Sequence, residues 1–126
     1  MKQIEEISFQ MIADVGSANA FYLEAVSEAK KGNIGDAREL LKKGESCYRD
    51  SHRVHAELIM KMAGGEEIPI DMILMHAEDQ LMNAEVIKLL AEQVIELCQV
   101  VIPLKQRVDS LEEKWTCFEG QGKGES

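Results

Sequence analysis

Apolar residues recur every three or four positions along most of the chain, the spacing that places them on one face of an α-helix. The first stripe spans residues 2–31 and ends at Gly32-Asn33, where Asn33 suits the N-cap of a second helix. The second stripe ends near Ala63, before Gly64-Gly65, and Pro69 with Asp71 begins a third helix. The two stripes consist of Ile4, Ile7, Met11, Val15, Ala18, Tyr22, Ala25 and Ala29, and of Ala37, Leu41, Gly44, Tyr48, His55, Leu58 and Met62. This pattern predicts an all-α fold, an antiparallel three-helix bundle.

The third stripe alternates steps of three and four residues, which is typical of a coiled-coil seam. Its members are Ile73, His76, Gln80, Asn83, Ile87, Leu90, Val94, Leu97, Val101, Leu104, Val108, Leu111 and Trp115. The seam is polar in its first turns and apolar afterwards. Pro103 lacks the amide hydrogen that a helix interior uses, so we expect the helix to kink or stop there. We therefore divide the chain into a three-helix domain (1–102), a helical extension (103–119) and a flexible tail (120–126).

The composition fits a folded protein, since 45% of the 126 residues are hydrophobic. No apolar run approaches about 18 residues, so no membrane insertion is predicted. The acidic opening lacks the apolar stretch of a signal peptide, and Cys47, Cys98 and Cys117 form no disulfide framework, so we expect a cytoplasmic protein. The formal charge of −9 argues against nucleic acid, whose phosphates this surface would repel. Its expected partners are proteins or small molecules.

One polar constellation on the third helix can carry chemistry. His76, Asp79, Gln80 and Asn83 are spaced three, four and seven residues apart, which places them on overlapping sides of one helix. An imidazole offers a neutral, nucleophilic nitrogen near neutral pH. The spacing alone leaves open that His76 is an ordinary core side chain.

A metal site is a second interpretation of the same region. His52 and His55 lie three residues apart on the second helix, where they could face the third helix and bind zinc together with His76 or Asp79. Against this, the chain has no His-Glu-x-x-His pair and no cysteine ligands at suitable spacing.

Two longer blocks carry a family resemblance. Ser-His-Arg-Val-His-Ala-Glu-Leu-Ile (51–59) and His-Ala-Glu-Asp-Gln-Leu-Met (76–82) resemble the lactose/cellobiose/diacetylchitobiose class of enzyme IIA components of the bacterial phosphoenolpyruvate-dependent sugar phosphotransferase system (PTS). The resemblance covers residues 2–100. The family block reads His-Ala-Gln-Asp-His-Leu-Met, so Glu78 stands where Gln is common and Gln80 where a second His is usual. His52 matches a family His, and His55 stands where Gln is usual.

The resemblance implies a phosphotransferase component that works through a phosphohistidine. His76 would accept a phosphoryl group from the histidine phosphocarrier protein and pass it to a cysteine of the cognate enzyme IIB during uptake of a β-linked disaccharide. Gln80, Glu78, Asn83 and His52 would be supporting residues.

The resemblance also implies a homotrimer built through the seam of the third helix. Asp79 would lie at the trimer axis and help to hold a structural divalent cation such as Mg²⁺. The alternative function is a non-catalytic helical scaffold or regulatory relative in which His76 is buried.

Overall fold

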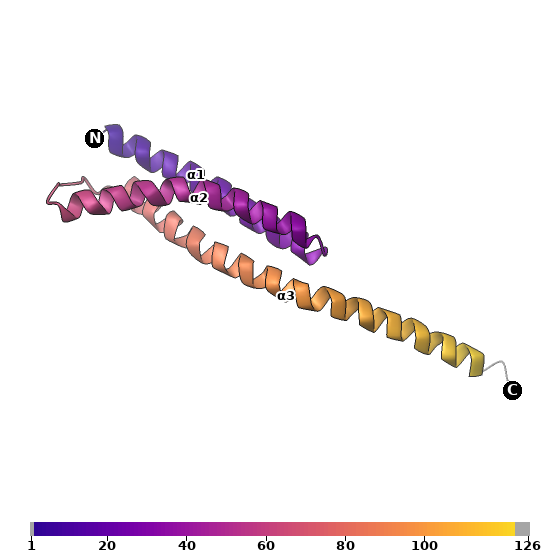
Figure 1. The fold of residues 1–126 in the computed structure, drawn as a ribbon. Helices are drawn as coiled ribbons and strands as arrows, with labels where there is room; N and C mark the ends of the chain where they lie inside the picture. The colour runs from indigo at the N-terminus through magenta and orange to yellow at the C-terminus, as the bar shows by residue number, and fades with distance from the viewer. Residues whose placement is uncertain (1, 123–126) are drawn as a thin grey trace.

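The computed structural model describes residues 2–122 and contains three helices, α1 (Lys2–Lys30), α2 (Ile34–Ala63) and α3 (Met72–Gly122). Figure 1 shows α1 and α2 as an antiparallel hairpin, with the first part of α3 against it and the second part projecting beyond it. No strand occurs among residues 2–122. The predicted all-α, three-helix architecture is confirmed.

The core is built from small side chains that allow the helices to approach closely. Of the predicted α1 stripe, every member from Met11 onwards is fully buried, and Ile4 and Ile7 are half-buried. On α2, Met62 is the one member of its predicted stripe that is exposed. The buried residues of α3 are Leu74, Ala77, Leu81, Ala84, Ala91 and Ile95. They pack mainly on α1, in three clusters that follow one another along the bundle.

The two helix starts differ in how they are capped. Asp71 caps α3, because its carboxylate Oδ1 accepts a hydrogen bond of 2.8 Å from the Leu74 amide. Asn33 occupies the N-cap position of α2, but its side chain makes no cap hydrogen bond and donates instead to Glu28 Oε2 at 2.8 Å. Asn33 is therefore the N-cap residue, as predicted, but its side chain does not form the hydrogen bond that we expected of a cap.

Gly44 is required where α2 crosses α1. A Cβ atom at this position would lie 2.5 Å from Cε1 of the buried Tyr22 and 3.1 Å from the Ala18 carbonyl oxygen. We expect Gly44→Ala to lower the free energy of unfolding by about 1–3 kcal/mol, because neither neighbour can move freely. Urea unfolding measures this. Gly16→Ala is the control, since nothing lies within 4 Å of its added Cβ, and it should stabilise α1 by roughly 0.5–1 kcal/mol. Equal effects of the two substitutions would contradict this packing.

An ion pair joins α3 to α2 and predicts a pH dependence of stability. Lys88 Nζ lies 2.8 Å from Glu45 Oε1, and this hydrogen bond lowers the pKa of Glu45 below its ordinary 4.5. A lowered folded-state pKa stabilises the fold above the ordinary value, and this stabilisation is lost as the pH falls through the folded-state value. Lys88→Met should therefore cost up to about 1 kcal/mol at neutral pH, as expected for a partly exposed pair, and almost nothing near pH 3. Urea midpoints at both pH values test this, and an equal cost at both would show that only packing of the lysine stem is lost.

α3 continues through Pro103 to Gly122. The predicted alternative of a helix that stops at Pro103 is wrong: the proline removes one amide donor, but the neighbouring turns remain helical. Gly120 to Gly122, which we expected to begin a flexible tail, belong to the helix, and residues 123–126 lie outside the described part of the chain. Within residues 2–122 we find no helix both long and apolar enough to cross a membrane.

Candidate functional site

His76 lies near the start of α3, shortly after its cap at Asp71. Its side chain is exposed. The interpretation of His76 as a buried core residue therefore does not hold within a single chain. The capped helix start fixes the backbone that carries the ring, and the ring itself is open to a partner.

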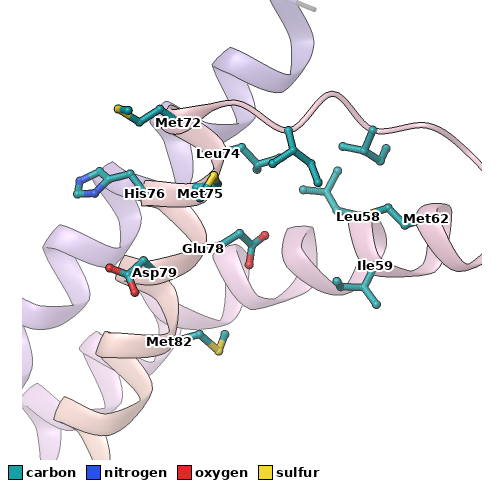
Figure 2. Close-up of a pocket in the computed structure, with 12 residues that line it drawn as sticks. Leu58, Ile59, Met62, Met72, Leu74, Met75, His76, Glu78, Asp79 and Met82 are labelled. Atoms are coloured by element: carbon teal, nitrogen blue, oxygen red, sulfur yellow. The ribbon is translucent and has the colours of Figure 1, made fainter.

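Asp79 shares the side of α3 on which His76 projects. In Figure 2 both side chains point away from α2, whereas Glu78 points toward α2. Asp79 and Asn83 are exposed, and Glu78 and Gln80 are half-buried. The structure thus brings His76 and Asp79 together on one open face and separates Glu78 from them.

The exposed stripe of α3 differs from the predicted seam in the bundle region. Ile73, Gln80, Ile87 and Val94 are half-buried, and Ile87 packs against the core of its own chain. The stripe that is exposed instead consists of Asp79, Asn83, Val86, Leu90, Gln93, Leu97, Val100 and Leu104. Asp79, which the predicted seam omitted, is thus part of the free stripe.

Glu78 and His55 form a contact between α3 and α2. His55 Nδ1 and Glu78 Oε2 make an ion pair when the imidazole is protonated, and both side chains are half-buried. The exposed His52 lies beside them, with its ring centroid 6.2 Å from that of His55. Glu78 and His55 are two of the positions at which the chain departs from the family pattern, so the two departures face one another. Each departure from the family pattern is visible in the sequence by itself, but the pairing of the two side chains is not.

An apolar groove of about 650 Å³ lies beside His76, between the end of α2, the α2–α3 loop and the start of α3 (Figure 2). Its lining residues are Leu58, Ile59, Met62, Ile68, Ile70, Met72, Leu74, Met75, His76, Glu78, Asp79 and Met82. Met72 is 83% exposed and Met75 62%. Methionine side chains adapt to varied partner surfaces, so this groove suits protein docking. The sequence did not predict this groove because three separate segments form it. The methionines that line it, Met62, Met72, Met75 and Met82, were nevertheless a visible signal.

The ligands for a metal site within one chain are not brought together. Residues 2–122 contain no group of three or more His, Cys, Asp or Glu side chains placed to hold a metal ion. His76 and Asp79 point away from α2 (Figure 2), which carries His52 and His55. The alternative zinc site is therefore wrong for the single chain. Asp79 supplies one exposed carboxylate, which is the kind of oxygen ligand that a hard cation such as Mg²⁺ takes.

Comparisons with known proteins agree with this geometry. Residues 6–99 match the family described as PTS system, Lactose/Cellobiose specific IIA subunit. The lichenan-specific phosphotransferase enzyme IIA component of Bacillus subtilis is 34% identical over 79% of this chain and 91% of its own length. The crystal structure of the PTS cellobiose-specific enzyme IIA from Bacillus anthracis superimposes with a TM-score of 0.78 at 37% identity, over 82% of this chain and 94% of that one.

A solution structure from Escherichia coli, of the IIA(Chitobiose)-HPr complex in the N,N'-diacetylchitobiose branch, matches with a TM-score of 0.68. Its identity to this chain is 26%, over 78% of this chain and 95% of that one. The matched family region contains the helical hairpin, the groove and His76, and ends where α3 leaves the bundle. This chain belongs to the lactose/cellobiose-specific IIA subunits of the PTS.

Proposed function

We propose that the chain carries a phosphoryl group on His76, accepting it from the histidine phosphocarrier protein and passing it to a cysteine of the cognate enzyme IIB. The observation that carries this proposal is an exposed imidazole on a capped helix, at the rim of an apolar groove. His76 is also the residue that corresponds, by the resemblance above, to the phosphorylated His of the family. The sugar would be a β-linked disaccharide, phosphorylated elsewhere in the system.

The transfer steps need little more than positioning. A neutral ring nitrogen of His76 attacks phosphorus while the phosphorus–nitrogen bond of the donor breaks, and the donor imidazole leaves. A thiolate of the acceptor then attacks the same phosphorus, and the His76–phosphorus bond breaks. Phosphoryl transfer depends mainly on in-line geometry and charge stabilisation. The nearby N-terminus of α3 would favour the bound dianion by about 0.3–1 kcal/mol.

The groove supplies the surface on which a donor or acceptor would dock. A relative of this chain forms a complex with the phosphocarrier protein HPr, which supports HPr as the donor here. One carrier must present the same nitrogen to two proteins in turn, and an adaptable, methionine-lined surface beside that nitrogen suits both. Gln80, Glu78, Asn83 and His52 would act as supporting residues around it.

We also propose that the working form is a homotrimer, with the exposed stripe of α3 at its axis. Three Asp79 side chains would then meet, and two carboxylates about 4 Å apart repel by roughly 4 kcal/mol at an effective dielectric of 20. A Mg²⁺ ion held by these carboxylates would remove the repulsion, and its role would be structural.

Removal of divalent cations tests the role of Asp79. We expect a chelator to weaken the wild-type trimer, because the axial carboxylates lose their counter-charge. Asp79→Asn should make assembly insensitive to the chelator, since an amide carries no charge. Sedimentation with and without Mg²⁺ measures the oligomeric state of the wild-type chain and of the Asp79→Asn variant. A wild-type trimer that is indifferent to the chelator would rule out an axial cation.

A reconstituted transfer assay tests the proposed function. The chain is incubated with labelled phosphoenolpyruvate, enzyme I and the phosphocarrier protein, and a cognate enzyme IIB is added afterwards. We expect the chain to take up label and to lose it to enzyme IIB. A chain that stays unlabelled beside a competent IIA control would reject the proposal and favour the scaffold or regulatory alternative.

A further inference from the structure

The distal part of α3 is a helix without a partner among residues 2–122 of its own chain. Ile102 is the last half-buried residue, and it lies next to Gly32, where an added Cβ would be 3.5 Å from Ile102 Cγ2. Residues 103–122 are exposed throughout and project beyond the hairpin (Figure 1), over ~30 Å at about 1.5 Å per residue. They lie outside the family match, which ends at residue 99. An isolated helix of this length is only marginally stable in water, so a covering partner would stabilise it.

Two faces of α3 change differently where the helix leaves the hairpin. The face that packs on the hairpin carries a small side chain at every seventh residue, and the same series becomes charged beyond it: Ala77, Ala84, Ala91 and Cys98, then Lys105, Glu112 and Glu119. A neighbouring face stays apolar to the end. Its residues are Leu104, Val108, Leu111, Trp115 and Phe118, which are 49% to 66% exposed. Beyond the hairpin the apolar side chains therefore persist on a face that no part of residues 2–122 covers.

We infer that residues 104–119 form a parallel, in-register coiled coil with the same segment of other copies of this chain. With Val108 and Trp115 at heptad position a, the basic residues Arg107 and Lys114 occupy g. Each is followed in the next heptad by an acidic residue at e, Glu112 or Glu119. In a parallel, in-register pair, g of one helix faces the following e of its partner, so both contacts join opposite charges.

The charges at g also disfavour an antiparallel arrangement. There g faces g, which would place Arg107 and Lys114 against one another, whereas the parallel arrangement pairs each with an acidic residue. A membrane surface is a poor occupant as well, because residues 103–122 carry four acidic and three basic side chains, whereas interfacial helices are rich in Lys and Arg. The segment follows the exposed stripe that we propose at the trimer axis and shares Leu104 with it, but the charge pattern is an independent observation and requires no phosphoryl group on His76.

Charge reversals in the full-length chain test this inference. One double variant, Arg107→Glu with Lys114→Glu, makes every g and e contact of these two heptads acidic. A second, Glu112→Lys with Glu119→Lys, makes them basic, and the quadruple variant restores opposite charges in the reversed order. We expect each double variant to raise the apparent dissociation constant of the homo-oligomer roughly tenfold or more, as measured by sedimentation. The quadruple variant should return to the wild-type value, and high salt should reduce all the differences.

Two outcomes would overturn the inference. The double variants could self-associate as strongly as wild type, which would mean that another kind of partner covers this helix. The quadruple variant could also fail to recover, which would mean that the charges do not face one another. Label uptake in the transfer assay is measured on the same samples: failure of wild type to take up label would reject the proposed function and leave the association result standing.

Discussion

Replacing His76 with alanine should lower phosphoryl uptake by about a thousandfold or more, because it removes the nucleophile that forms the covalent intermediate. The substitution should leave folding unchanged, since the side chain is exposed. Initial rates of label transfer from the phosphorylated phosphocarrier protein measure the loss. Helix content and the urea midpoint confirm that the fold is intact.

Substitutions of the two other histidines are the matched controls for this result. His52 and His55 lie on α2 and beside Glu78 rather than on the open face with His76. His52 is proposed as a supporting residue and not as the nucleophile, so His52→Ala should lower uptake by no more than a few-fold. His55→Gln, which restores the usual family residue, should do the same while it removes the contact to Glu78. A His76→Ala chain that is labelled at the wild-type rate would place the chemistry on another residue.

Replacing Leu97 with aspartate should convert the assembly into monomers. Leu97 is 61% exposed in the single chain and lies on the free stripe of α3, so its change costs the folded monomer little. In a trimer, three buried leucines are lost at about 1.5–3 kcal/mol each, roughly 5–9 kcal/mol in total. Three carboxylates would also meet near the axis. Sedimentation at micromolar concentration should show monomers that remain helical.

A substitution on α2 tests whether this effect is specific to the stripe. Met60 is 75% exposed and lies on α2, outside the free stripe of α3. Met60→Asp makes the same kind of apolar-to-charged change and should leave the trimer intact. If Leu97→Asp assembles as well as Met60→Asp, another surface holds the copies together.

Local chemistry made much of the fold predictable. The apolar period of α1 and α2, the glycines at the two turns and the acid that caps α3 each act within a few residues, and they place all three helices correctly. His76 and Asp79 were also identifiable, because a distinctive seven-residue block contains both. These features need no knowledge of how the helices are arranged in space.

Features that depend on packing between helices could not be predicted in the same way. Four members of the predicted seam in the bundle, Ile73, Gln80, Ile87 and Val94, are half-buried, because the rotation of α3 is set by how it packs on α1. The groove beside His76 combines three segments that are apart in the sequence. The pairing of His55 with Glu78 joins two helices, and neither local sequence determines which turns of the two helices lie side by side. The sequence left open whether the helix kinks or stops at Pro103, and α3 continues through it because a single lost amide donor does not end a long helix.

Mapping of the phosphorylated residue tests the central claim most directly. The chain is charged through the phosphocarrier protein, digested under conditions that preserve phosphohistidine, and analysed by tandem mass spectrometry with nuclear magnetic resonance of the imidazole protons. We expect a single phosphoryl group, bound to the imidazole ring of His76. Phosphate on His52 or His55, with His76 unmodified, would contradict it.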